Sequence, residues 1–306
     1  MNRYLTWAAP VAALGLILSG CSSDNSSSSD TSAPGSETTT SAAAAPNPLV
    51  EKAATEYKAY AVAQIDELVG VVKTFTDAVR AGNLQAAQDA YAPSRLPWER
   101  IEPLAGLVEE IDGKVDARVD DFAGVDDPAF TGWHRLEFLL FQQNTTDGGA
   151  PFADQLDKDV ATLKEQFADI EVKPIDVSTG AAELIEEVSE GKITGEEDRY
   201  SKTDLWDFDA NLQGSQAAVD KLSPALAEAD PALLGKIDAG LTQVFDTMRP
   251  LRRGDGWVLF CTQNDPYPSP RCPEVTVTPD VIDKLKAELA GLSENLSQVS
   301  GVLKLQ

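Results

Sequence analysis

The sequence predicts an all-α fold, built as two antiparallel helical bundles that join near residues 170–180. Three observations lead to this prediction. From Pro48 onward, apolar residues recur mostly three or four positions apart, which is the spacing of a helix with one buried face. Proline stands at good helix starts in Asp230-Pro231 and Thr278-Pro279. Alternating β-branched residues are rare, and only 274–278 reads as a short strand.

The expected helices follow one another with recognisable stop signals between them. Gly82-Asn83 ends the first run, and Pro93 and Pro97 break the second after Tyr91. The expected helical runs are 49–79, 84–91, 98–111, 133–141, 152–167, 181–188, 203–226, 231–251 and 279–303. Together they predict a helical domain over residues 48–306.

The first 21 residues have the pattern of an export signal. Arg3 precedes an apolar run at 5–18 that is too short to span a bilayer, and the run ends in Leu18-Ser19-Gly20-Cys21. Small residues followed at once by cysteine are the pattern of a bacterial lipoprotein signal. We therefore expect residues 1–20 to be removed and Cys21 to carry the lipid. An ordinary secretory signal with a chance cysteine is the alternative.

Residues 21–47 are expected to be a disordered tether. From 22 to 46 they are almost all Ser, Thr, Ala, Asp, Gly and Pro, with no aromatic residue and no Leu, Ile or Val. Such a stretch buries too little apolar surface to offset its conformational entropy. This organisation places the helical domain on the outer face of the cell membrane, in the cell envelope, held there by its lipid anchor.

The balance of charged residues limits which kinds of partner this protein can bind. Lys plus Arg number 25 and Asp plus Glu number 50, so the formal net charge is −25. This excludes a nucleic-acid partner, because phosphate binding depends on Lys and Arg. The acidity suits a cationic partner, and a metal ion is the simplest one. With one histidine and three cysteines, the chain cannot build a structural zinc site of four cysteine or paired cysteine and histidine ligands.

Two of the cysteines bracket a short loop. Cys261 and Cys272 enclose a stretch with proline and asparagine between two expected helices. Outside the cytoplasm a disulfide that closes this loop is the favoured use of the pair. A redox-active or metal-binding thiol pair is the alternative.

The single histidine lies in a pattern that suits a metal ion. His134 and Glu137 are three residues apart, so on a helix their side chains reach the same ion. An imidazole with carboxylates is a donor set for iron, manganese or zinc. Glu99 and Glu102 form a second such pair upstream, and Asp116 follows them. The plain alternative is a half-buried histidine beside an acidic face exposed to water.

These motifs, in this order, resemble the imelysin-like domain of the EfeO/EfeM iron-uptake proteins. The stretches that carry the resemblance are 99–103, 116–122, 132–137 and 195–208, and it extends over residues 48–306. The resemblance implies an extracytoplasmic iron-binding component of an EfeUOB-type uptake system. It implies iron as Fe²⁺ or Fe³⁺, with other divalent metals left open. The implied partners are a membrane iron permease and a peroxidase-like protein of the same system.

The resemblance also assigns site residues. His134 and Glu137 match the metal motif, and Glu99, Glu102 and Asp116 match the acidic positions thought to complete the site. Asp120 and Asp121 match less securely. The chain departs from the family pattern at Lys202, where the family often has histidine. Residues 22–46 are too short and too polar to form the cupredoxin domain of the longer members, so we expect the short, EfeM-like form.

Two other functions are left open by the sequence, and neither is favoured. Related families have been labelled peptidases, but zinc peptidases of the His-Glu-x-x-His type need two histidines on one helix. We expect no enzyme and no catalytic residue. A lipoprotein that binds an anionic polysaccharide would need an aromatic or basic groove. Its candidates are Trp98, Trp133, Trp206, Trp257, Arg249, Arg252 and Arg253.

Overall fold

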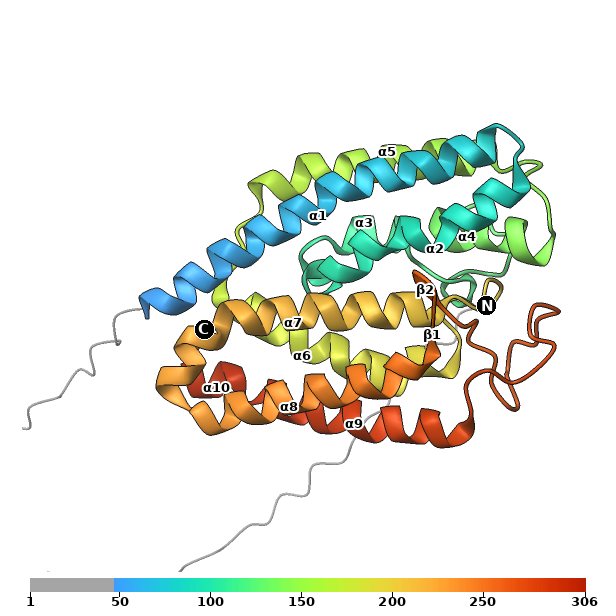
Figure 1. The fold of residues 1–306 in the computed structure, drawn as a ribbon. Coiled ribbons are helices and arrows are strands. Elements are labelled where there is room, and N and C mark those ends of the chain that lie inside the picture. Colours follow the sequence, from blue (N-terminus) through green and yellow to red (C-terminus); the bar gives the residue numbers. More distant parts are fainter. Residues whose placement is uncertain (1–46) are drawn as a thin grey trace, which may run out of the picture. The chain divides into compact units, whose positions relative to one another are not determined.

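Helices make up most of the chain over residues 47–306, the part that the computed structural model describes (Figure 1). The all-α prediction is confirmed. The expected signal peptide, the lipid-bearing Cys21 and almost all of the expected tether lie outside the described residues, and the first domain boundary stays a prediction. Within the described residues, no helix is both long enough and apolar enough to cross a membrane.

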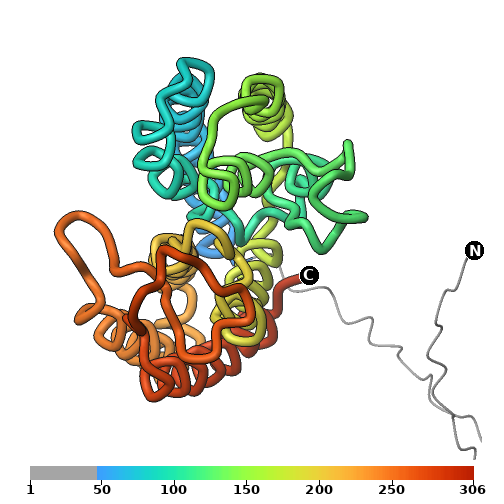
Figure 2. The backbone as a smooth tube through the Cα atoms, turned by 90° about the vertical axis from the view of Figure 1, so that its right-hand side faces the viewer, coloured from blue at the N-terminus to red at the C-terminus, as the bar shows by residue number. Residues whose placement is uncertain are grey.

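The described helices group into two halves, seen one above the other in Figure 1 and end-on in Figure 2. In the first half α1 runs alongside both α2 and α5, and the short α3 and α4 lie beneath α5. Its helices are α1 (Pro48–Arg80), α2 (Leu84–Ile101), α3 (Glu109–Val115), α4 (Gly132–Glu137) and α5 (Ala150–Asp169), with 3-10 turns at Glu102–Leu107 and Val119–Asp121 and a π-helical turn at Phe138–Gln142.

The second half packs α6 against α7 and α9, and α8 against α7 and α9. Its elements are α6 (Pro174–Glu190), α7 (Asp204–Ala229), α8 (Pro231–Met248), β1 (Arg252–Arg253), β2 (Gly256–Trp257), α9 (Pro279–Ser297) and α10 (Val299–Leu303), with 3-10 turns at Lys192–Thr194 and Arg249–Leu251. Helices α1 and α2 pack on α7, and one continuous apolar core runs through both halves.

Helix α2 corrects the expectation that proline ends it. Pro93 and Pro97 both lie inside Leu84–Ile101 without breaking the helix. Each proline removes one N–H from the helix, and the remaining backbone stays helical on both sides of it. The buried face of α2 against α1 and α7 outweighs the local preference.

The expected run 98–111 is divided instead of continuous. Pro103 has no N–H to donate to the Glu99 carbonyl, so α2 ends at Ile101 and a 3-10 turn follows. The Glu99 carbonyl instead accepts the Asn211 side-chain amide at 3.0 Å. Nearer the carboxyl end, 274–278 forms no strand, and the two short strands are β1 and β2, which pair as an antiparallel hairpin.

Two glycines allow the second half to approach this bend. A Cβ at Gly180 of α6 would collide with the Pro103 carbonyl, and one at Gly214 of α7 would collide with the Arg100 carbonyl. The backbone of α2 and its 3-10 turn is therefore held directly against α6 and α7. Glu99 and Glu102 project from this bend, at the junction of the two halves.

Candidate metal centre

Asp116 and His134 meet because α3 ends against the start of α4. Gly132, the first residue of α4, has φ +75°, and a Cβ there would collide with the Val115 carbonyl. The Thr131 hydroxyl also donates to the Lys114 carbonyl at 3.0 Å. This contact places the Asp116 carboxylate 3.4 Å from Nε2 of His134, a side chain that is buried.

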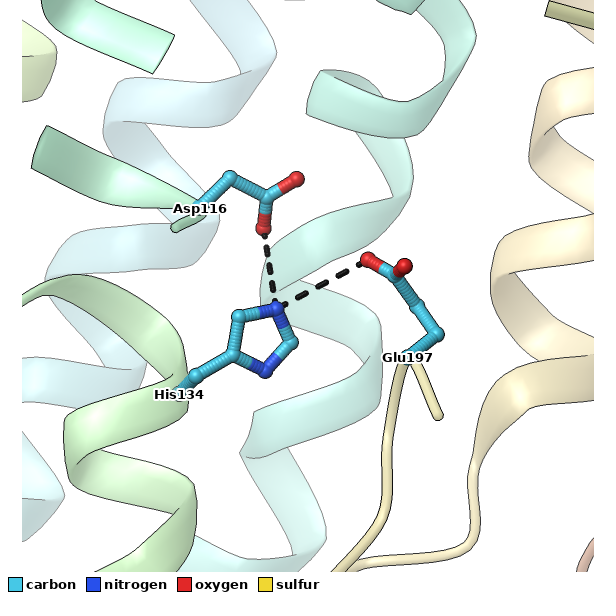
Figure 3. Close-up of side chains that lie close together, drawn as sticks. All are labelled: Asp116, His134 and Glu197. Carbon is cyan, nitrogen blue, oxygen red and sulfur yellow. Dashed lines mark ion pairs between the residues drawn. The ribbon is translucent and has the colours of Figure 1, made fainter. Parts of the chain in front are cut away.

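Glu197 approaches the same ring nitrogen from the second half of the molecule. Its Oε1 lies 3.7 Å from His134 Nε2, and Figure 3 shows both carboxylates facing the same ring nitrogen. Glu197 is buried and belongs to the turns between the 3-10 helix at Lys192–Thr194 and α7. One nitrogen and two carboxylates from three separate segments thus converge on one point, and these three residues could hold a metal ion.

Glu137 lies on the other side of the imidazole. Its Oε2 is 3.2 Å from His134 Nδ1, and its Oε1 accepts the backbone N–H groups of Tyr200 and Ser201 at 2.8 and 2.7 Å. The sequence led us to expect His134 and Glu137 to reach one ion together. The structure places Glu137 at the opposite ring nitrogen from Asp116 and Glu197. A second possible ligand group, His134, Glu137 and Asp198, lies on that side.

Two buried cations stand among the carboxylates. The Arg95 guanidinium is fully buried, and it pairs with Glu99, with Asp116 and, at 2.9 Å, with Glu197. The Lys192 ammonium is 1% exposed. It lies 3.4 Å from Glu99, 2.6 Å from Glu102 and 3.7 Å from Glu197.

We call the four carboxylates Glu99, Glu102, Asp116 and Glu197 the acid cage. Three of them are sequence-predicted site residues, and the structure brings these together with His134. The remaining predicted acids lie outside it, because Asp120 is exposed and pairs with Arg199, while Asp121 accepts the Arg118 backbone N–H at 3.0 Å.

More buried acid surrounds the cage. Asp198, Asp204 and Asp207 have no exposed surface, and Glu137 has none. Asp207 contacts Arg95 Nε at 3.3 Å through one oxygen, while its other oxygen, like one oxygen of Asp204, has no hydrogen-bond partner among the described residues. Eight carboxylates therefore face few buried cations. Such an excess is stable only if protons or added cations balance it.

The pKa values of these acids separate into two groups. Burial, with the neighbouring Glu102, raises the pKa of Glu99, and burial also raises the pKa of Asp207 well above its usual range. Burial also tends to raise the pKa of Asp116, but the contacts with Arg95 and His134 outweigh burial and hold this pKa below its usual range. The cage thus contains carboxyl groups whose pKa values are shifted in opposite directions.

A cavity of about 720 Å³ opens onto the cage. Glu102, Asp116, Lys192 and Glu197 form its inner wall, and Arg118 lies beside them. Its outer lining is acidic and comes from both halves of the molecule: Asp112, Asp121, Asp176, Glu183 and Glu187. A small hydrated cation has a route from solvent to the cage, along walls whose charge attracts it.

Comparison with known proteins identifies the family. The model described as Peptidase_M75: Imelysin matches residues 53–297, which is most of the chain. The chain belongs to the imelysin family.

Its relatives in this family carry the name "Iron uptake system component EfeO". The protein of that name from Escherichia coli O157:H7 is 45% identical over 254 residues, and the proteins from Escherichia coli K12 and Shigella flexneri are 44% identical. Each alignment covers 83% of this chain and 64% of the relative. The imelysin chain thus matches somewhat less than two thirds of the length of these relatives.

Sequence reasoning did not single out Arg95, Lys192 or Glu197 in this imelysin chain. Glu197 lies in the stretch 195–208 that carries the resemblance, so the sequence holds a signal for it beside the departure at Lys202. Lys202 is buried and pairs with Asp265 at 2.7 Å, away from the cage. Arg95 and Lys192 follow no ligand pattern, because a cation is recognisable as part of a carboxylate site only from the fold.

The tryptophans of the polysaccharide alternative are not available in the imelysin fold. Trp98 and Trp133 have no exposed surface, Trp257 is buried, and Trp206 is half-buried against Gly256. Arg252 stacks on Trp257, with its guanidinium carbon 4.6 Å from the ring centroid. No aromatic platform for a sugar is present among these residues.

Proposed function

We propose that this chain is an extracytoplasmic iron-binding component of an iron uptake system, in which the acid cage and His134 Nε2 hold the iron as cargo. The observation that supports this most is the set of buried carboxylates that outnumber their buried cations and open onto an acidic cavity. Carboxylates with one imidazole suit iron in either common oxidation state, and other divalent metals share this preference. The name of the relatives agrees with this function.

We place the ion on the Nε2 side of His134. On the Nδ1 side, Glu137 already accepts two backbone N–H groups and contacts the imidazole, and Asp198 accepts the Tyr91 hydroxyl at 2.8 Å. These contacts support a role for Glu137 in orienting the ring, with Nδ1–H as the donor to its carboxylate. On the other side of the ring, Nε2 faces Asp116 and Glu197, as Figure 3 shows, and once it has no proton it can bind an ion together with them.

Metal titration of ring and cage variants tests this assignment. The full chain is purified in detergent and titrated with Fe(II) without oxygen, in competition with a coloured chelator. We expect His134→Ala and Glu197→Gln each to weaken iron binding by more than about 100-fold. Glu137→Gln should cost about 10–100-fold, as is typical when a residue that orients a ligand is lost.

Glu110→Gln is the matched control. Glu110 is an exposed acid on α3. Its only ion pair within residues 47–306 is to Lys114, outside the cage, so its loss should leave iron affinity unchanged. Circular dichroism confirms that each variant is folded. If Glu137→Gln loses as much affinity as Glu197→Gln, the ion belongs on the Nδ1 side. If wild-type protein binds no iron, the proposed function is wrong.

We also propose that the chain is lipid-anchored through Cys21 and passes its ion to a membrane iron permease, with a peroxidase-like partner in the same system. The lipoprotein pattern at residues 18–21 and the relatives' name support this. Cys21→Ser should release the protein from the membrane fraction. Unchanged, detergent-dependent fractionation of that variant would contradict the anchor.

A further inference from the structure

The segment Gly195–Thr203, which we call the site loop, carries essential parts of the metal centre without regular structure of its own. It contributes Glu197 to the cage, and its Tyr200 and Ser201 N–H groups hold Glu137. Its backbone consists of turns, with a helix beginning only at Asp204. Its position therefore depends on what packs against it.

The loop closed by the Cys261–Cys272 disulfide covers the outer side of the site loop. We call residues 262–271 the disulfide loop, and its expected disulfide is present in the structure, with the two Cα atoms 5.3 Å apart. Arg271 donates to the Ser201 carbonyl, and Arg199 lies over the Tyr267 ring with its guanidinium carbon 4.2 Å from the centroid. Just before the disulfide loop, the Phe260 N–H donates to the Lys202 carbonyl at 2.8 Å.

Lys202 adds an ion pair to these contacts. Its side chain is completely buried, its backbone has φ +63°, and its ammonium lies 2.7 Å from Asp265 Oδ2. Asp265 is the one carboxylate paired with Lys202 among the described residues. A buried ammonium without a charge partner is strongly unfavourable, so Asp265 supports this conformation of the site loop.

The disulfide keeps Asp265 in place. Residues 262–271 contain no helix and no strand, apart from a single bridge between Thr262 and Val277. A loop of this kind regains many conformations once its ends are released. The chain of contacts runs from the disulfide to Asp265, from Asp265 to Lys202, and from Lys202 to the neighbouring amides that hold Glu137.

We propose that the disulfide loop is a positioning element of the metal centre, with Lys202 and Asp265 as its positioning residues. The proposal rests on the proposed iron-binding function. The loop touches no ion itself. It holds Glu197 at the cage and Glu137 at the imidazole, so that the ligands are in place before the ion arrives and less binding free energy is lost in ordering them.

Iron titration of three variants tests the proposal, again with the full chain in detergent and Fe(II) without oxygen. Cys261→Ser/Cys272→Ser removes the disulfide without a thiol reductant, which would itself bind or reduce iron. Asp265→Asn leaves the Lys202 ammonium without its partner, and Lys202→Met/Asp265→Asn removes both charges. We expect at least a tenfold loss of iron affinity for the first two variants, and a smaller loss for the third than for Asp265→Asn.

A spectroscopic measurement separates positioning from general stability. Co(II) bound in place of iron reports the geometry of its ligands through its visible absorption, and we expect this spectrum to change in the first two variants. The helical circular dichroism should stay at the wild-type level. Asp246→Asn is the control, because it breaks an exposed ion pair with Arg249 elsewhere on the chain and should alter neither measurement.

The outcomes are distinguishable. If wild-type protein binds no iron, the proposed function fails. If wild type binds iron and both the disulfide-free and Asp265→Asn proteins bind it equally well with an unchanged Co(II) spectrum, the positioning role is overturned and the disulfide loop only closes a surface turn. Should the disulfide-free variant not fold, Asp265→Asn alone decides between these results.

Discussion

Glu197 Oε1 is the atom at which the charges of the site meet. It lies 2.9 Å from Arg95 Nη2, 3.7 Å from Lys192 Nζ and 3.7 Å from His134 Nε2. Two side chains that carry permanent positive charge therefore occupy the neighbourhood where a metal cation would bind. They offset part of the repulsion among the carboxylates while no ion is bound, and an incoming ion competes with them for the same oxygens.

Lys192 provides the test of this competition. Lys192→Met keeps the length of the side chain and removes the ammonium, so iron no longer has to share Glu102 and Glu197 with it. We expect iron affinity to rise by at least tenfold, since a unit charge a few ångströms from a divalent ion costs several kcal/mol even at an effective dielectric constant of about 20. We expect the metal-free protein to melt at a lower temperature, because the cage has lost a cation.

Lys114→Met is the control for the loss of one positive charge. Its ammonium is exposed and pairs with Glu110 on α3, outside the cage. Its affinity for iron should equal that of wild type within a factor of two or so, because exposed charges are screened by water and salt. Weaker iron binding by Lys192→Met would show that the ammonium supports the site and does not compete with the ion.

At the scale of elements, the site depends on the joint between α3 and α4. Asp116 follows the last residue of α3, and His134 is the third residue of α4, so the distance between their side chains is set by how closely the two helix ends approach. Gly132 sets this distance, since only a residue without a Cβ fits against the Val115 carbonyl at φ +75°.

Gly132→Ala should separate the two helix ends. The new methyl group collides with the Val115 backbone carbonyl, which cannot move aside as a flexible side chain can. Alanine is also strained at positive φ. We expect a loss of more than about 2 kcal/mol in the free energy of unfolding and at least a tenfold loss of iron affinity. Chemical denaturation and iron titration measure the two effects separately.

Gly70→Ala is the matched control for this substitution. Gly70 lies inside α1 with nothing near the position of an added Cβ. Alanine there should stabilise the protein by about 0.5–1 kcal/mol through helix propensity and leave iron affinity unchanged. A Gly132→Ala protein with unchanged stability and affinity would show that α3 and α4 have room to adjust.

Most helices, and part of the candidate site, could be predicted from the sequence. The helices were predictable because one buried face per helix leaves a three- and four-residue period, as in α1 with Tyr57, Ile65 and Leu68 buried. The continuation of α2 through Pro93 could not be predicted, because it depends on packing against α1 and α7. Glu99, Glu102, Asp116 and His134 were predictable from motifs. The position of Glu137 at Nδ1 could not be predicted, because it depends on the backbone N–H groups of Tyr200 and Ser201, more than sixty positions away.

At the scale of the whole molecule, the site lies where the two halves meet. The first half contributes Glu99, Glu102, Asp116 and His134, and the second half contributes Lys192 and Glu197. Like charges from both halves thus face one another across one junction, in a chain whose net charge is −25. The stability of the metal-free protein is therefore coupled to how many of these acids hold a proton.

Asp112 makes this coupling measurable. It lines the cavity, and burial together with the charge of Asp116 raises its pKa to about 7. Burial also raises the pKa of Asp204. An unfolded aspartate loses its proton near pH 4, so between pH 4 and 7 the folded protein binds more protons than the unfolded chain. The free energy of unfolding must then fall as the pH rises through this range.

Asp112→Asn should flatten that profile. Asparagine keeps the shape of the side chain and carries no charge, so the part of the decline due to Asp112 disappears, by about 1–2 kcal/mol between pH 5 and 7.5 after allowance for its partial exposure. Urea denaturation with a metal chelator present measures it. Asp77→Asn is the control. Arg80 and Lys73 lower the pKa of this exposed carboxyl, so Asp77 affects the pH dependence of the unfolding free energy only below about pH 4. Parallel profiles for wild type and Asp112→Asn would mean that Asp112 is ionised in the folded protein throughout this range, and that the cavity wall carries its full negative charge.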